Sequence, residues 1–150
     1  MAFLEINGQE FEAKCTFKFE RLADKKYSEK DEKGNEVDGF MNLYMNLLDY
    51  SNKHLLAFWD CGLEYLVGKK PKLEDIEAAI EKRIEEDGDT EKLFKEAFVA
   101  FDESGFFKKK AKSFWRDLEL MKETGKTKEE KEQNLLVYNR MTKSRDELRA

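Results

Sequence analysis

The segment Lys53–Val67, KHLLAFWDCGLEYLV, constrains the fold more than any other part of the chain. Apolar side chains occupy most of its positions, so a helix formed here would have almost no polar face. A helix of this kind is normally surrounded by other elements of the fold. It is also too short to cross a bilayer. We therefore expect a central helix over 53–67, with Ser51 as its N-cap and Gly68 just beyond its end.

The composition describes a well-solvated chain with enough apolar residues for one core. The chain has 150 residues, a common size for a single domain, and 41% of them are charged. Its 12 phenylalanines argue against disorder, because disordered chains are poor in aromatic residues. A net charge of -5 disfavours a general nucleic-acid binder, which is normally basic.

The cysteines and the N-terminal segment bear on the cellular compartment. Cys15 and Cys61 form no CxxC motif, which suits a reduced cytosolic protein, with one disulfide between them as the alternative. The apolar run Ala2–Ile6 is too short for a signal peptide, and no run is long enough to span a bilayer. We therefore expect no membrane association.

The N-terminal segment predicts a β-hairpin. Asn7-Gly8 lies between two alternating runs, and this dipeptide suits a type I′ turn because both of its residues adopt positive φ readily. A two-residue loop would place one set of side chains on the face toward a core: Ala2, Leu4, Ile6, Phe11 and Ala13. The open edges of the hairpin could also pair with another copy, which would allow self-association.

Apolar residues at helical spacing predict further helices along the rest of the chain. Their ranges are 16–27, 38–48, 72–86, 90–103, 106–123 and 127–148, with a polar loop over 28–37. The fold class expected is therefore mainly α, a bundle of six to seven helices with an N-terminal β-hairpin. We expect residues 1–126 to form one hairpin-plus-helical domain and residues 127–150 a C-terminal helix that is loosely docked or partner-binding.

The chain lacks the parts of common catalytic and metal sites. His54 is the only histidine, and it stands at a helix start, where a solvated or capping role is expected. The segment Asp31–Asp38 superficially suggests a calcium loop, but Glu36 stands where glycine is required. Neither GxxxxGK[ST] nor GxGxxG occurs. We therefore predict no enzymatic activity, no catalytic residues, no metal site and no cofactor.

One basic cluster lies among aromatic residues. Its lysines are Lys108, Lys109, Lys110 and Lys112, and the aromatic residues beside them are Phe106, Phe107, Phe114 and Trp115. Two interpretations are open: a surface for an acidic or nucleic-acid partner, or a solvated face opposite an aromatic core stripe. Lysines in the first turn of a helix oppose its dipole, which hints at a partner.

The last predicted helix is highly charged and has few apolar residues. These are Leu135, Leu136, Val137, Tyr138 and Met141. A helix of this composition is either loosely docked on the domain or an arm that folds when it binds a partner.

Three segments resemble the tail assembly chaperones of long-tailed bacteriophages that infect Gram-positive bacteria. The strand, Asn-Gly and second strand followed by TFKFERLADKKY resemble the start of these proteins. KKPKLEDIEAAIEKRIEE resembles their proline-opened acidic helix, and DTEKLFKEAFVAFDESGFFKKKAKSF their stretch with Gly-Phe-Phe and a lysine run. The resemblance covers residues 3 to 114, and none of its motifs is catalytic.

The resemblance implies a helper protein of the host cell cytoplasm that is not in the mature virion. Such chaperones coat the helical tape measure protein and bring in major tail protein, and many also exist in a longer, frameshifted form. We expect surplus apolar surface late in the chain to contact the client or a neighbouring copy. The residues concerned are Phe106, Phe107, Lys108, Lys109, Lys110, Phe114, Trp115, Leu135, Leu136 and Tyr138.

Two other functions stay open at this point. A small regulatory or nucleic-acid-binding protein would use Lys108–Lys112, and its binding would weaken steeply with salt. A hydrolytic enzyme would need a pocket that holds His54 beside a carboxylate.

Overall fold

The N-terminal hairpin forms with the predicted register. The computed structural model describes residues 1–150, and its first two strands, β1 (Phe3–Ile6) and β2 (Gln9–Glu12), are antiparallel. Asn7 and Gly8 have φ of 52° and 80°, as a type I′ turn requires. Ile6 pairs with Gln9, and the alternate residues Ala2, Leu4 and Ile6 are buried. The hairpin lies against α4 (Leu73–Asp87).

Side chains already occupy part of both outer edges of the hairpin. In this register, the polar backbone groups of Phe3 and Glu12 point away from the partner strand. Arg83 donates to the Phe3 carbonyl at 3.4 Å, and the Tyr65 hydroxyl donates to the Glu12 carbonyl at 2.7 Å. A further strand would have to displace these donors.

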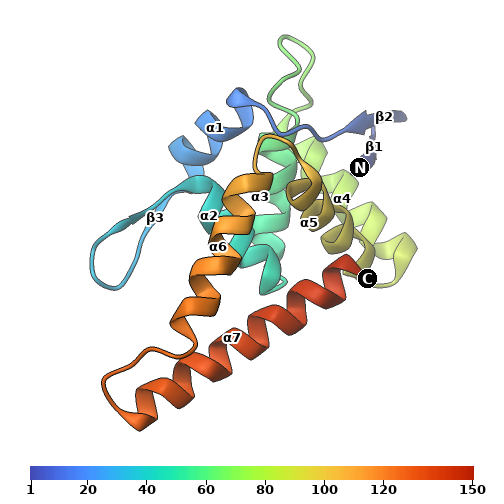
Figure 1. The fold of residues 1–150 in the computed structure, drawn as a ribbon. Coiled ribbons are helices and arrows are strands. Elements are labelled where there is room, and N and C mark those ends of the chain that lie inside the picture. The colour runs from blue at the N-terminus through green and yellow to red at the C-terminus, as the bar shows by residue number, and fades with distance from the viewer.

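The rest of the chain is helical, as predicted, so the expected fold class is confirmed (Figure 1). The remaining helices are α1 (Phe17–Tyr27), α2 (Gly39–Leu48), α3 (Asn52–Gly62), α5 (Glu91–Glu103), α6 (Lys108–Met121) and α7 (Lys128–Arg149). Thr16 and Asp38 cap α1 and α2, because their side chains accept from the backbone N–H groups of Phe19 and Met41. The predicted polar loop 28–37 instead contains a small exposed hairpin, β3 (Glu29–Lys30) and β4 (Glu36–Val37).

Helix α3 is the central helix, but it ends earlier than predicted. It packs against α1, α2, α4 and α5, and most of its residues are buried. The prediction that it continues to Val67 was wrong: Val67 is 72% exposed in the loop after Gly62. The reason is a tertiary contact. A Cβ on Gly62 would lie 2.8 Å from the Cβ of Ala13, and the Gly62 carbonyl accepts from the N–H of Lys14 at 2.9 Å.

Phenylalanine side chains from several helices meet in the centre of the core. Phe40 of α2 stacks on Phe107 with ring centroids 4.4 Å apart, and Phe101 of α5 lies 5.2 Å from Phe58 and 5.4 Å from Phe19. Each aromatic pair adds about 0.5–1.5 kcal/mol beyond its buried area. Phe17, at the start of α1, is 68% exposed and does not join this cluster.

A buried carboxylate joins α1, α3 and the loop that follows α3. Asp60 accepts from Lys26 and from the Tyr27 hydroxyl, each at 2.7 Å, and from Lys70 at 2.6 Å. Burial raises the pKa of Asp60, but the hydrogen bonds from these three donors outweigh burial and hold it below its ordinary value. Asp60 is therefore ionised at neutral pH and is fully partnered.

We predict that Asp60→Asn lowers the free energy of unfolding by about 2 kcal/mol at pH 7, since buried donors lose their charged acceptor. Because the pKa of Asp60 is lowered in the folded state, its contribution is fully present above the ordinary value of 3.8 and is lost as pH falls below it. Urea unfolding of both proteins between pH 3 and pH 7 should give curves that converge in acid. Asp117→Asn, at an exposed residue, is the control.

Gly39 allows α1 and α2 to cross at contact distance. A Cβ on Gly39 would lie 2.1 Å from the Ala23 carbonyl carbon, which is backbone and has no room to move. We predict that Gly39→Ala destabilises the fold by about 3 kcal/mol or more, measured by urea unfolding. Gly105→Ala is the control, because nothing lies within 4 Å of its added methyl group. Equal stability of the two variants would contradict this account of the crossing.

Candidate functional site

His54 does not face a catalytic partner. It is buried and its ring nitrogens meet only side chains, so the expectation of a solvated or capping histidine was wrong. Its Nδ1 lies 2.6 Å from the Ser51 hydroxyl and its Nε2 lies 3.4 Å from the Asn42 amide nitrogen. Burial lowers the pKa of the imidazole. The Ser51 side chain therefore engages His54 and makes no capping bond to the backbone of α3.

The two cysteines are free thiols, Cys15 half-buried and Cys61 buried. Burial raises the pKa of Cys15 to about 11. Burial also raises the pKa of Cys61, and the neighbouring Asp60 carboxylate adds to that effect. Neither thiol is activated as a nucleophile at neutral pH. No three His, Cys, Asp or Glu side chains come together as a metal site would need, and none of the helices is both long and apolar enough to cross a membrane.

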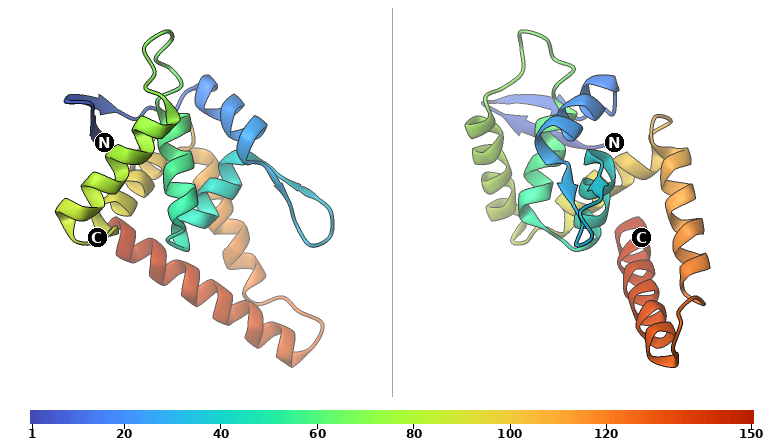
Figure 2. Two further views of the ribbon diagram at one scale, coloured as in Figure 1. Left: turned by 180° about the vertical axis from the view of Figure 1, so that it is seen from behind. Right: turned by 90° about the vertical axis from the view of Figure 1, so that its left-hand side faces the viewer.

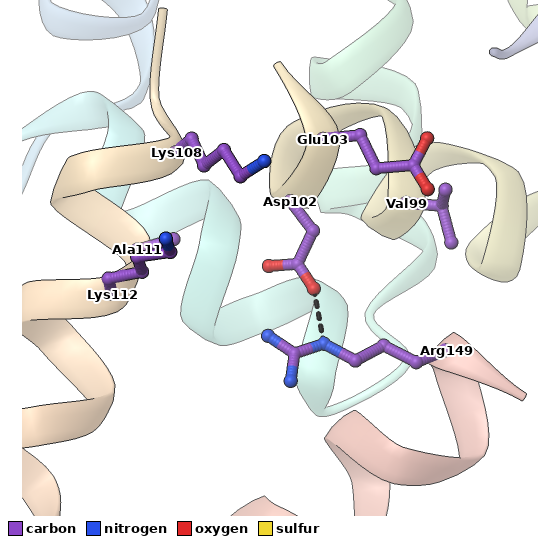
Figure 3. Close-up of a pocket in the computed structure, with 7 residues that line it drawn as sticks. All are labelled: Val99, Asp102, Glu103, Lys108, Ala111, Lys112 and Arg149. Carbon is purple, nitrogen blue, oxygen red and sulfur yellow. Dashed lines mark hydrogen bonds and ion pairs between the residues drawn. The ribbon is translucent and has the colours of Figure 1, made fainter. Parts of the chain in front are cut away.

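The basic cluster at the start of α6 is partly neutralised by acidic neighbours. Lys110 donates to Asp38 at 2.9 Å and lies 5.2 Å from the centroid of the Phe40 ring. Lys108 and Lys112 line a cavity of about 340 Å³ between α5, α6 and the end of α7 (Figure 3). The other residues lining this cavity are Val99, Asp102, Glu103, Ala111 and Arg149. Lys109 is exposed.

The aromatic residues beside the cluster divide between core and surface. Phe107 and Trp115 are buried, and Phe106 and Phe114 are half-buried. Phe106 makes an edge contact with Phe17, with ring centroids 4.9 Å apart. This end of α6 fits the interpretation of a solvated face opposite an aromatic core stripe. A partner-binding role for these residues stays a prediction.

A chain of hydrogen bonds links four helices. The Trp115 indole N–H of α6 donates to the Tyr44 hydroxyl of α2 at 2.7 Å, and that hydroxyl donates to Asp102 of α5 at 2.7 Å. The second oxygen of Asp102 accepts from Nε of Arg149 at the end of α7 (Figure 3). Burial and the Asp102 carboxylate both raise the pKa of Tyr44, so its hydroxyl stays a donor.

The C-terminal half of α7 docks on α2, α5 and α6, with Leu148 as its one fully buried side chain and Met141 partly buried against the core. Leu148 is 1% exposed, and the Arg145 guanidinium carbon lies 4.7 Å from the Trp115 ring centroid. The Tyr50 hydroxyl donates to Glu147 at 3.3 Å. One buried leucine contributes about 1.5–3 kcal/mol, and a cation–π contact or half-exposed ion pair about 1 kcal/mol or less. The docking of α7 is therefore weak compared with the packing of the core.

The other half of α7 projects from the body together with the end of α6 (Figures 1 and 2). We define residues 117–138 as the arm. Its two helices contact each other: Lys122 lies 4.9 Å from the Tyr138 ring centroid, and Asn134 donates to the Thr124 carbonyl at 2.8 Å. Thr127 caps α7 by accepting from the N–H of Glu130, and the Glu130 carboxylate accepts from the N–H of Lys126.

The arm exposes large apolar side chains on both sides of its connecting loop. They are Leu120 (67% exposed), Met121 (53%), Leu135 (44%) and Leu136 (64%). Leu135 and Leu136 were predicted from the sequence, whereas Leu120 and Met121 were missed. Their signal was two adjacent large apolar residues outside the buried stripe of α6. Tyr138, also predicted, is half-buried under Lys122.

Residues 3–116 match the protein family described as phage tail assembly chaperone protein, TAC. The chain belongs to this family. The match confirms the resemblance to tail assembly chaperones, and it ends at Arg116, just before the arm. No curated protein and no solved structure shows significant similarity to the chain. The family assigns the protein a role in the assembly of phage tails, with protein partners.

Proposed function

We propose that this tail assembly chaperone binds the tape measure protein and recruits major tail protein while the tail tube forms. In this proposal it is non-catalytic, acts in the cytoplasm of a Gram-positive host and is absent from the mature virion. The single observation that carries the proposal, beside the family, is the set of exposed apolar side chains on the arm. Exposed apolar surface on a projecting element is typical of protein-binding sites.

The arm suits contacts that must later be reversed. Its apolar side chains are few and are spread among charged residues, so each client contact would bury only a small apolar area. Weak contacts of this kind give way when a better partner, such as the growing tube, competes for the client. An amphipathic client helix could lie along the arm and contact Leu120, Leu135 and Leu136.

The alternative of a regulatory or nucleic-acid-binding protein has less support. Lys110 already pairs with Asp38, and Lys108 and Lys112 stand beside Asp102 and Glu103.

Self-association through the hairpin edges is not part of the proposal, because Arg83 and Tyr65 occupy backbone acceptors there.

The double substitution Leu120→Ser with Leu136→Ser should weaken binding of the tape measure protein about tenfold or more. Both side chains are exposed, so the fold should be unchanged, while client binding loses the burial of two leucines at about 1 kcal/mol or more each. The affinity is measured by calorimetry or by pulldown with purified tape measure protein.

The matched control is Leu73→Ser, an exposed leucine on α4, far along the chain from the arm. It should bind the tape measure protein as the wild type does. Undiminished binding by the double variant would remove the arm from the client site.

A further inference from the structure

The surface beneath the docked half of α7 belongs to the part of the chain that the family shares. Tyr44, Asp102 and Trp115, which form its polar chain, all lie within residues 3–116. Helix α7 lies outside that match and covers this surface. The family region thus contains a surface that accepts a helix, and here the chain supplies the helix itself.

The contacts of α7 show what kind of helix this surface accepts. Met141, Arg145, Leu148 and Arg149 are at positions i, i+4, i+7 and i+8, and so share one helical face. Leu148 is buried in the core cluster, Arg145 lies over the Trp115 ring, and Arg149 donates to Asp102. The surface therefore binds an amphipathic helix that alternates apolar and cationic side chains.

Helix α7 fills this surface incompletely and is held weakly. Leu148 is the only buried residue of its 22. A cavity of about 340 Å³ stays open beside Arg149, between α5 and α6 (Figure 3). A helix with larger side chains at this end would cover more apolar surface than α7 does.

A second copy of the chain is a poor candidate to replace α7 on this surface. A tethered helix has a high effective concentration at its own site, on the order of millimolar for short linkers. An identical helix from another copy makes the same contacts without that advantage. Only a helix that fits better can replace α7. Because Asp102 would otherwise lose its cation, that helix must also carry arginine or lysine.

We propose that the surface of α2, α5 and α6 beneath α7 is a second client-binding site, and that an amphipathic, cationic helix of the client displaces α7 from it. This inference rests on the proposed function, since it takes the tape measure protein as the client. Helix α7 then acts as an intramolecular competitor. It covers Trp115 and Asp102 while the chaperone is free and releases them when a client helix binds.

The first test uses the full chain and a labelled peptide with the sequence of residues 137–150. Leu148→Asp should release α7 and bind the peptide at least tenfold more tightly than the wild type does, measured by fluorescence anisotropy. The double variant Arg145→Ala with Arg149→Ala, which adds no charge, should bind it more tightly as well. Leu73→Asp is the control for an aspartate at an exposed leucine, and circular dichroism checks that each variant is folded. If neither release variant binds the peptide more tightly than the wild type does, the surface is not a helix-binding site.

The second test measures affinity for purified tape measure protein. Leu148→Asp should raise this affinity about tenfold, and the 137–150 peptide should compete with the client on that variant. Equal affinities with no competition would overturn the second site while leaving client binding by the arm intact. If neither protein binds the tape measure protein, the proposed function itself fails, and the identity of the occupant fails with it. A dimer of the wild type that Leu148→Asp abolishes would overturn the proposal in favour of a second copy.

Discussion

The stack of Phe40 on Phe107 fixes how the arm is joined to the helical body of the molecule. Phe40 comes from α2, and Phe107 is the residue just before α6, so their contact at 4.4 Å sets where α6 leaves the body. Phe101 packs against both rings. From this point α6 runs outward as one continuous helix, and the arm can therefore project from the body in one direction (Figure 1).

The family region, residues 3–116, supplies almost all of the buried core. Leu148 of α7 is the one buried core residue that comes from beyond residue 116. What lies beyond that residue is mostly surface: the arm, with its exposed leucines, and the docked end of α7. The structure thus separates a part that maintains the fold from a part that contributes little to the core. The arrangement suits a chaperone whose partners must be bound and then given up.

Local signals in the sequence predicted local structure well. The Asn7-Gly8 turn set the hairpin register as expected, because a tight turn involves residues only a few positions apart. The end of the central helix was mispredicted because the Gly62 carbonyl accepts from the N–H of Lys14, a long-range bond that no local pattern records. The basic cluster was ambiguous for the same reason, since Lys110 and Asp38 are 72 positions apart. The last helix was expected to be loosely docked or an arm, but the direction in which the arm projects could not be foreseen, because it depends on where Phe107 is anchored.

The continuity of α6 has a consequence for how this chain tolerates change. An α-helix advances about 1.5 Å and turns about 100° per residue, so its two ends keep a fixed angular phase. The hydrogen bond from Trp115 to Tyr44 fixes the rotation of α6 about its axis, and this rotation sets the direction in which the connecting loop begins. Inserting or deleting one residue between Arg116 and Met121 would rotate the arm by about 100°, a little over a quarter of a turn, and move Leu148 out of its buried position. The length of this short segment therefore decides whether α7 can dock on the body, although most of its own residues are exposed to water.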